Sequence, residues 1–338
     1  MYKELEKILP QTKNIFLVTG KKSYKTSGAE ETINKILKKN KVFRFSNFAG
    51  NPKIEDVKKG TSLFKKQTYD LIIAVGGGSV IDMAKLIKNE SMSKIPLIAI
   101  PTTAGSGSEA THFAVLYVGK VKHSVADRKI LPNMTILDPR LSMKLDQKLT
   151  ATTGMDAFSQ AIESYWAIGS TKTSQKYAKE SIKLLLKNIE KAIKEPTLAI
   201  RRNMLRASNL AGKAINISKT TAPHALSYTL TSYFDVLHGQ AVGVFLPAFL
   251  EFNYRKSKNK KTINELLELL KCKDIYEARN KIQSLMKNIG LKTTLSELGI
   301  EKKNDLEKIV NNVNTERLGN NPAKITKKEL KDIIKQLS

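Results

Sequence analysis

One stretch of the chain carries an acid and an amide at a spacing that suits metal binding. Asp156 and Gln160 lie four residues apart within 153–166, where apolar residues recur at helical spacing. Residues four apart in a helix share one face. Two of the four histidines, His224 and His238, follow in a second apolar stretch. Together these groups form a ligand set for one divalent metal, although an Asp/Gln pair alone is more often a solvated helix face.

Two turns rich in small residues indicate phosphate binding. The apolar strand 71–75 runs directly into GGGS at 76–79, and a helix follows. Glycines let backbone amides approach a phosphate, and a helix N-terminus adds partial positive charge. The sequence matches neither the GxGxxG nor the Walker pattern, so a simple strand-to-helix turn is the alternative. A second such turn, 101–109, follows the strand 97–100, and turns at neighbouring strand ends predict a nucleotide-binding crevice.

The order of strand and helix signals predicts the fold class. Strands at 15–18, 41–45, 71–75 and 97–100 alternate with helices near 30–39, 51–66 and 80–88. Such alternation is typical of a doubly wound α/β domain with a mostly parallel sheet. Extended segments follow near 113–118, 122–125 and 134–137, and from about residue 149 almost everything is helical. We predict an α/β dinucleotide-binding domain at 1–148 and an all-helical metal and substrate domain at 149–338.

The composition indicates a soluble globular protein. Of the 338 residues, 41% are apolar and 26% are charged, and no apolar run is long enough to span a bilayer. The first residues mix both charge signs and lack the apolar core of a signal peptide. A single cysteine, Cys272, excludes an intrachain disulfide framework and a thiolate zinc site. We therefore expect a cytoplasmic protein with no membrane partner.

The formal net charge of +27 raises the alternative of a basic nucleic-acid-binding protein without catalysis. The lysines, however, are spread over many amphipathic segments, such as 179–194, 256–271 and 302–335. Scattered lysine is more often a solvated surface than a nucleic-acid footprint. We therefore expect no nucleic-acid partner. A third reading is that a few of these cations flank a site for an anionic small molecule.

Six blocks of the sequence together resemble the iron-containing (group III) alcohol dehydrogenase family, which has a dehydroquinate synthase-like fold. The blocks are GGGSVIDMAK (76–85), PTTAGSGSEAT (101–111), LDP (137–139), TGMDAFSQAIE (153–163), PHALSYTLTSYFDVLHG (223–239) and NNP (320–322). They span nearly the whole chain in family order. The resemblance implies an N-terminal nucleotide-binding domain, a helical C-terminal domain, and a metal-dependent, NAD(P)H-linked oxidoreductase of alcohols or aldehydes.

The resemblance also implies the metal ligands. Asp156 matches the first family ligand, and His224 and His238 match two family histidines. The family's second ligand is normally a histidine, and here that position holds Gln160, whose carbonyl is a weaker, neutral donor. A further family histidine that helps relay protons is replaced by Tyr228. We expect Fe²⁺ or Zn²⁺ on these four ligands, with Tyr228 and His238 taking part in catalysis.

Matching positions supply the expected cofactor contacts. The glycine-rich turn would hold the pyrophosphate, the second turn would lie beside the adenosine and nicotinamide, and a lysine would touch the ribose. The expected cofactor-binding residues are Ser46, Gly77, Gly78, Ser79, Asp82, Thr102, Thr103, Ser106 and Lys122.

The position of Ser46 bears on the choice of cofactor. Family members that prefer NAD usually carry an aspartate there, which bonds the adenosine ribose. Without that carboxylate a 2′-phosphate is not repelled, and Lys21, Lys22 or Arg44 could help to hold it. We therefore predict NADPH over NADH.

Departures from the family type point to a substrate. The Gln160 variant, with SEATHFAV (108–115), QAIESYWAI (160–168) and KTTAPHALSY (219–228), is similar to the phosphonoacetaldehyde reductase subgroup. Such enzymes reduce phosphonoacetaldehyde to 2-hydroxyethylphosphonate in phosphonate biosynthesis, which implies a small anionic aldehyde as substrate. The candidate partners of the phosphonate are His112, His123, Arg128, Lys129, Lys219, Ser159 and Tyr228.

Two enzyme classes remain as alternatives. The first is a general short-chain alcohol or aldehyde dehydrogenase acting on unphosphorylated substrates. The second is a metal- and NAD-dependent sugar-phosphate cyclase on the same fold, but the clustered lysines and arginines of that class are not found beside the expected ligands. A homodimer is one option for the assembly.

Overall fold

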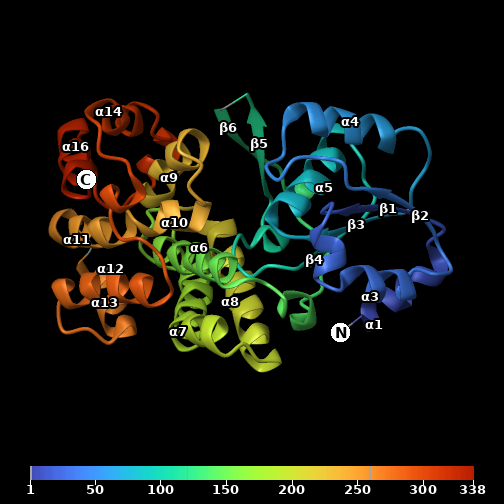
Figure 1. Ribbon diagram of the computed structural model, residues 1–338, viewed down its shortest axis with the longest axis horizontal. Coiled ribbons are helices and arrows are strands. Elements are labelled where there is room, and N and C mark those ends of the chain that lie inside the picture. The colour runs from blue at the N-terminus through green and yellow to red at the C-terminus, as the bar shows by residue number, and fades with distance from the viewer. Residues whose placement is uncertain (1, 120, 259) are drawn as a thin grey trace. The chain divides into compact units, whose positions relative to one another are not determined.

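The computed structural model describes residues 2–119, 121–258 and 260–338, which divide into two compact units (Figure 1). The N-terminal unit comprises Met1–Leu145 and Pro196–Asn209, and the C-terminal unit comprises Asp146–Glu195 and Leu210–Ser338. Helix α8 (Leu198–Ser218) belongs in part to each. The boundary near residue 148 stays a prediction.

A five-stranded parallel sheet forms the centre of the N-terminal unit. Its strand order is β2-β1-β3-β4-β7. The strands are β1 (Asn14–Thr19), β2 (Lys41–Phe45), β3 (Leu71–Gly76), β4 (Leu97–Pro101) and β7 (Met134–Thr135). Strands β3 and β4 are buried at every position, which explains their unbroken apolar runs. The chain leaves β1 toward β2 and later returns to β3 on its other side, so the β1/β3 boundary is the switch point of the sheet.

Helices cover both faces of this sheet, which confirms the predicted doubly wound architecture. Helices α4 (Ile54–Phe64) and α5 (Gly78–Glu90) share one core with strand residues such as Phe16 and Ile72. Helices α1 (Lys3–Ile8) and α3 (Ala29–Ile36) share the other, with α2 (Ser23–Thr26) beside them. Alternate side chains of each strand therefore enter opposite cores.

A separate antiparallel hairpin follows the sheet. It consists of β5 (Phe113–Val118) and β6 (Val121–Ala126). The sequence predicted extended structure here, but not the pairing. Strand β7 is shorter than the predicted segment 134–137, and α5 begins at Gly78 rather than at residue 80. The earlier start matters, because it brings the glycine-rich turn into the first turn of the helix.

The C-terminal unit is all-helical, as predicted. Its helices are α6 (Gln147–Trp166), α7 (Lys172–Lys194), the second part of α8, α9 (Ala222–Tyr233), α10 (His238–Gly243), α11 (Leu246–Lys256), α12 (Lys260–Leu270), α13 (Ile275–Asn288), α14 (Lys303–Asn311), α15 (Thr315–Gly319) and α16 (Lys327–Gln336). Helix α6 is almost wholly buried and packs against α7 and α10. A helix buried on all sides is the natural scaffold for polar groups that must be held rigidly.

Short 3₁₀ turns complete the fold. They lie at Leu9–Gln11, Ser108–Ala110, Arg128–Ile130, Pro139–Ser142 and Ser296–Leu298. None of the helices in the described residues combines the length and apolar character needed to cross a membrane.

Candidate metal and nucleotide sites

Helix α6 presents a polar stripe inside an apolar core. The Asp146 carboxylate caps its N-terminus by accepting from the Leu149 backbone N–H at 2.7 Å. Asp156, Gln160 and Glu163 then follow at helical spacing, and all three are buried. Burial of three such groups is costly unless they are bonded to each other or to a ligand.

Two histidines meet this stripe from the starts of two other helices. His224 lies in the first turn of α9, just after a helix-starting proline, and His238 is the first residue of α10. The Nε2 atom of His224 lies 3.3 Å from Oδ1 of Asp156, and the two imidazole centroids are 5.4 Å apart. One ligand atom from each of Asp156, His224 and His238 lies within 4.8 Å of the other two. These separations are close to the roughly 3–4 Å between ligands that share one ion.

Glu163 fixes the orientation of His224. Its side chain is fully buried, and Oε2 bonds Nδ1 of His224. Its Oε1 accepts from the Thr221 backbone N–H at 2.9 Å and from the Thr221 hydroxyl at 3.0 Å. An imidazole that donates from Nδ1 keeps its Nε2 lone pair for a metal, so this is a carboxylate–histidine arrangement of the kind found behind metal ligands.

The same carboxylates govern the charge of His224. Burial lowers the pKa of the imidazole, but Glu163 and Asp156 more than offset this and raise it to about 9. Without an ion, His224 is therefore mainly protonated at neutral pH and compensates the buried carboxylates.

Gln160 contacts the cluster through Asp156. Its Nε2 donates to Oδ1 of Asp156 at 3.1 Å, so the amide orients the carboxylate. Rotation of the amide by 180° would exchange the positions of its oxygen and nitrogen, and only the oxygen can bind a metal. The ligation of a metal by Gln160 stays a prediction.

Gly239 allows α10 to approach α6. A Cβ at this position would lie 1.7 Å from the backbone carbonyl oxygen of Thr152, a distance that no side chain tolerates. The glycine therefore permits the close helix contact that carries its neighbour His238 to Asp156.

Tyr228 lies beside His238, and Arg317 lies close to Tyr228. Tyr228 is one turn after His224 on α9, and its ring centroid is 6.1 Å from that of His238. Burial raises the pKa of Tyr228, and the Arg317 guanidinium lowers it in part. Arg317 is only 7% exposed and lies on α15, which packs against α9.

Other predicted partners of the substrate are engaged elsewhere. The Lys219 ammonium pairs with Glu316 at 2.7 Å, and the Ser159 hydroxyl donates to the Met155 carbonyl at 2.8 Å. The remaining candidates lie in the N-terminal unit, on or beside the β5–β6 hairpin and the turn that follows it: His112, His123, Arg128 and Lys129.

The two small-residue turns of the N-terminal unit meet, as predicted. Gly77 caps α5, and Gly76 pairs with Pro101 across β3 and β4. A Cβ at Gly78 would lie 2.5 Å from the Ser106 hydroxyl oxygen. Larger residues would force the turns apart, so the glycines keep the α5 amides accessible at the carboxyl end of the sheet.

A buried charge network supports these turns. The Lys85 ammonium bonds the Ser108 carbonyl and hydroxyl groups and the Phe113 carbonyl, the last at 2.8 Å. Asp82 accepts from the Ser108 hydroxyl and from the Val115 N–H at 3.0 Å. Burial lowers the pKa of Lys85 to about 8 and raises that of Asp82.

This network bears on two of the predicted cofactor residues. Lys122, on β6, is near enough to Asp82 to lower its pKa. The Asp82 carboxylate links α5 to the second turn through Ser108 and to the hairpin through Val115. It therefore positions these two segments. Cofactor contacts by all nine expected residues (Ser46, Gly77, Gly78, Ser79, Asp82, Thr102, Thr103, Ser106 and Lys122) stay predictions.

Ser46 follows β2, and Arg44 lies near the carboxyl end of the same strand. The Arg44 Nε donates to the Thr19 hydroxyl at 2.8 Å, and its guanidinium covers the Tyr24 ring at 4.6 Å. Glu30 lies 3.4 Å away. A cation is thus held where the carboxyl end of β1 meets the end of β2.

Comparison with known proteins identifies the family. Residues 1–139 match the model of iron-containing alcohol dehydrogenases, and residues 150–338 match that of the C-terminal part of the Fe-containing alcohol dehydrogenase family. The chain belongs to the iron-containing alcohol dehydrogenase family. It is therefore an NAD-linked alcohol or aldehyde dehydrogenase, which excludes the alternative of a binding protein without catalysis.

Individual relatives agree with this assignment. The NAD-dependent methanol dehydrogenase of Bacillus methanolicus is 30% identical over 96% of this chain and 92% of that protein. The NADPH-dependent butanol dehydrogenase of Clostridium saccharobutylicum is 30% identical over 96% of this chain and 93% of its own. The solved structure of sulfoacetaldehyde reductase from Bifidobacterium kashiwanohense in complex with NAD⁺ is 29% identical, with a TM-score of 0.91 over 99% of this chain and 94% of that one.

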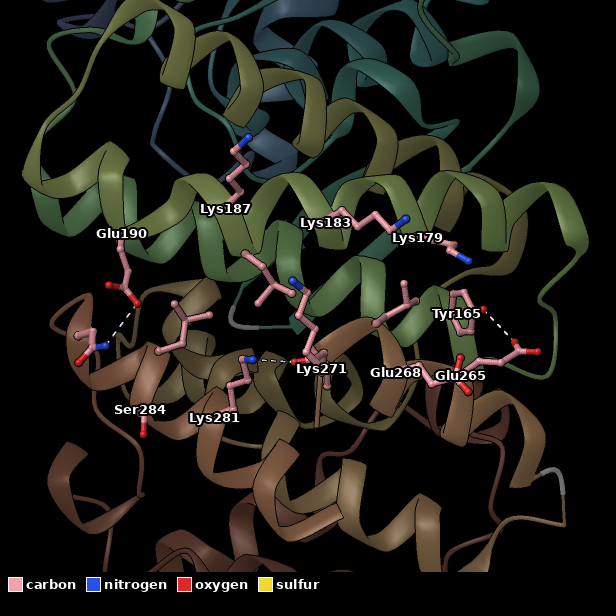
Figure 2. A pocket seen from close by; sticks show the side chains of 15 residues that line it. Tyr165, Lys179, Lys183, Lys187, Glu190, Glu265, Glu268, Lys271, Lys281 and Ser284 are labelled. Atoms are coloured by element: carbon pink, nitrogen blue, oxygen red, sulfur yellow. Dashed lines mark hydrogen bonds between the residues drawn. The ribbon is translucent and has the colours of Figure 1, made fainter. Parts of the chain in front are cut away.

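A cavity of about 1070 Å³ in the C-terminal unit is not lined by Asp156, His224 or His238, the residues of the candidate metal-site cluster (Figure 2). Figure 2 shows Lys179, Lys183 and Lys187 along α7, with Lys271 and Lys281 on the opposite wall. Glutamates line it as well, and the Glu265 carboxylate accepts from the Tyr165 hydroxyl at 2.9 Å. We therefore place no step of the dehydrogenase reaction there.

Sequence reasoning missed Glu163, Gly239 and Arg317 as members of the site. Glu163 and Gly239 fall inside the family blocks, and the seven-residue spacing from Asp156 to Glu163 was an available signal. Arg317 carried no signal apart from its place shortly before the NNP block.

Replacement of Glu163 by glutamine tests its hold on His224. The amide cannot supply the charged hydrogen bond to Nδ1, so we expect metal affinity to fall by about 10- to 100-fold. Titration of the apoprotein with Zn²⁺ against a competing chelator measures the change. Glu265→Gln, which alters a carboxylate bonded to Tyr165 instead, should bind as the unaltered protein does. Equal affinity in Glu163→Gln would show that the contact is only structural.

Gly239→Ala tests the approach of α10 to α6. The new methyl group meets the Thr152 carbonyl, so we expect destabilisation of about 1–3 kcal/mol and loss of bound metal as His238 moves away. Urea unfolding and metal content of the purified protein report the two effects. Gly50→Ala is the control, because a Cβ there meets nothing within 4 Å. A stable, fully metallated Gly239→Ala protein would refute the steric argument.

Proposed function

We propose that this chain is a metal-dependent reductase of a short anionic aldehyde, with phosphonoacetaldehyde as substrate and 2-hydroxyethylphosphonate as product. The observation that supports reductase chemistry most directly is the meeting of Asp156, His224 and His238 within 4.8 Å. The Gln160 variant and its flanking blocks support the phosphonate assignment by resemblance. The similarity to a sulfoacetaldehyde reductase supports an aldehyde that carries a tetrahedral anion.

The donor set fits the metal of the family. Asp156, His224 and His238 would hold Fe²⁺ or Zn²⁺, since a carboxylate and imidazoles suit both ions. Gln160 would be a fourth, neutral ligand or the orienting partner of Asp156. When bound, the ion supplies a Lewis acid and the nicotinamide supplies a hydride.

The chain's own residues then position the reaction and move its proton. Glu163 keeps the Nε2 lone pair of His224 available by accepting from Nδ1. Tyr228 lies next to His238 and is the proposed proton donor to the carbonyl oxygen, because burial keeps its phenol protonated. One hydride to carbon and one proton to oxygen convert the aldehyde to the alcohol, with NADPH oxidised to NADP⁺.

NADPH is the proposed reductant. Ser46 offers no carboxylate to repel a 2′-phosphate, and Arg44, near the end of the same strand β2, supplies a cation that a phosphate would share with Glu30. By their names, relatives of similar identity include both an NAD-dependent and an NADPH-dependent enzyme, so the family alone does not decide between them.

A second candidate is a general short-chain alcohol dehydrogenase. Relatives named as methanol and butanol dehydrogenases, each 30% identical, favour it. The two functions differ in whether a charged group on the aldehyde improves turnover.

Steady-state oxidation of NADPH by enzyme loaded with a single metal separates these functions. With Fe²⁺ or Zn²⁺, we expect kcat/KM for phosphonoacetaldehyde to exceed that for butyraldehyde by at least about 100-fold, the size of one or two charge-assisted hydrogen bonds. Comparable values would favour the general dehydrogenase. No turnover of any aldehyde with Fe²⁺, Zn²⁺ or Mn²⁺ would end the reductase proposal. Asp156→Ala and His238→Ala should lose both metal and turnover.

Ser46→Asp tests the cofactor proposal. A carboxylate beside the adenosine ribose repels the 2′-phosphate and bonds the free 2′-hydroxyl of NADH. We expect the ratio of kcat/KM for NADPH over NADH to be above one in the unaltered enzyme and to fall at least about tenfold in the variant, one charge-assisted interaction. Ser46→Asn has similar size without the charge and should change the ratio little. An unaltered enzyme that prefers NADH would contradict the proposal.

A further inference from the structure

We propose that Arg317 binds the anionic group of the substrate and sets the preference for phosphonate- or sulfonate-bearing aldehydes. This inference rests on the proposed function, because it assigns a residue to the anion that the substrate would carry. It names a cation that sequence resemblance did not suggest, in place of Lys219.

Arg317 is one side chain removed from the metal-site cluster. His238 is a member of that cluster, and the Tyr228 ring lies beside it with centroids 6.1 Å apart. Arg317 in turn lies on α15, which packs against α9, the helix that carries Tyr228 and His224. In phosphonoacetaldehyde a single methylene separates the carbonyl carbon from the phosphonate. A carbonyl at the cluster therefore places the anion within a side chain's length, where Arg317 lies.

The local fold turns Arg317 inward. The Asn314 side chain caps α15 by accepting from the Arg317 N–H at 2.9 Å. The preceding residue, Glu316, is exposed and is held by Lys219 at 2.7 Å. These contacts leave Arg317 as the buried residue of the turn, at 7% exposure.

Competing cations are less suitable. Two arginines are buried among the described residues, and the other, Arg201, belongs to the N-terminal unit. Lys219 is exposed and pairs with the exposed Glu316, whereas Arg317 is buried. A guanidinium offers two parallel N–H groups to a tetrahedral oxyanion, and partial burial strengthens that interaction relative to a surface lysine.

The same feature explains discrimination against neutral aldehydes. A site built around a charged donor loses that interaction when the substrate lacks the partner, whereas an apolar pocket distinguishes poorly between small aldehydes. Arg317 would thus accept phosphonate and sulfonate through shared oxyanion chemistry.

Substitution of Arg317 tests the assignment through a ratio of specificities. Phosphonoacetaldehyde, sulfoacetaldehyde and propionaldehyde are compared in the metal-loaded unaltered enzyme, Arg317→Gln and Arg317→Lys. We expect the ratio of kcat/KM for each anionic aldehyde over propionaldehyde to fall about 10- to 100-fold in Arg317→Gln and less in Arg317→Lys. Arg255→Gln, an exposed arginine of the same unit paired with Glu251, should keep the ratio unchanged.

A binding measurement without metal or cofactor gives a second readout. Titration of the apoprotein with methylphosphonate and methanesulfonate, by calorimetry, should show binding that weakens at least about tenfold in Arg317→Gln and persists in Arg255→Gln. Thermal unfolding confirms that the variants are folded.

The outcomes separate the two proposals. If the unaltered enzyme prefers neutral aldehydes, the proposed function fails and methylphosphonate binding still decides the role of Arg317. If anionic aldehydes are preferred but the ratio survives in Arg317→Gln, the function stands and the Arg317 assignment is wrong. Absence of methylphosphonate or methanesulfonate binding to the unaltered apoprotein also overturns the assignment.

Discussion

The bond between the Glu163 carboxylate and Nδ1 of His224 is the interaction on which the metal-site cluster depends. It joins α6 to the start of α9 inside the core. The backbone N–H and the hydroxyl of Thr221 both donate to the other oxygen of the Glu163 carboxylate. The buried Trp166 indole N–H donates to the Thr221 hydroxyl at 2.9 Å, so even this supporting residue is fixed. These bonds hold Glu163 and Nδ1 of His224 rigidly, whereas Nε2 of His224 is buried without a hydrogen-bond partner in the part of the chain that the structure describes.

The N-terminal unit also relies on buried charged side chains, here to support the glycine-rich turn. The Lys85 ammonium and Asp82 carboxylate lie behind the glycine-rich turn and hold Ser108 between them. Their bonds reach the second turn and the hairpin, so two buried groups of opposite charge that share Ser108 tie α5 to both segments. The helix N-terminus at Gly78 can then lack side chains, because the Lys85 and Asp82 bonds make the turn rigid. In both units, the residues that would touch a ligand are held in place by buried charged side chains, and those supporting side chains would not touch the ligand themselves.

The parts of this arrangement that depend on local sequence pattern could be predicted from the sequence. Buried runs such as that of β3 predicted strands, and the block around Asp156 predicted a helix with its polar face. Pairing of β5 with β6 was not predictable, because partner choice is a tertiary property. Gly239 looked like any helix glycine, since the Thr152 carbonyl that requires it lies on another helix. Arg317 was one basic residue among 58, and what distinguishes it is burial on a helix that packs against α9.

Charge within the cluster argues that Gln160 alone cannot set the preference for an anionic substrate. Glutamine and neutral histidine carry the same charge, so this replacement leaves the electrostatics of the ligand set unchanged. With a divalent ion bound, Asp156 and Glu163 would balance its charge, and that part of the cluster would be neutral with His224 as a neutral imidazole. A phosphonate placed there would meet no net positive charge. The buried Arg317 beside Tyr228 changes this balance, because it adds the one cation that an anionic aldehyde would need on the far side of its methylene. On the proposed assignments, Gln160 would affect how the metal is held, and Arg317 would set which aldehyde is bound.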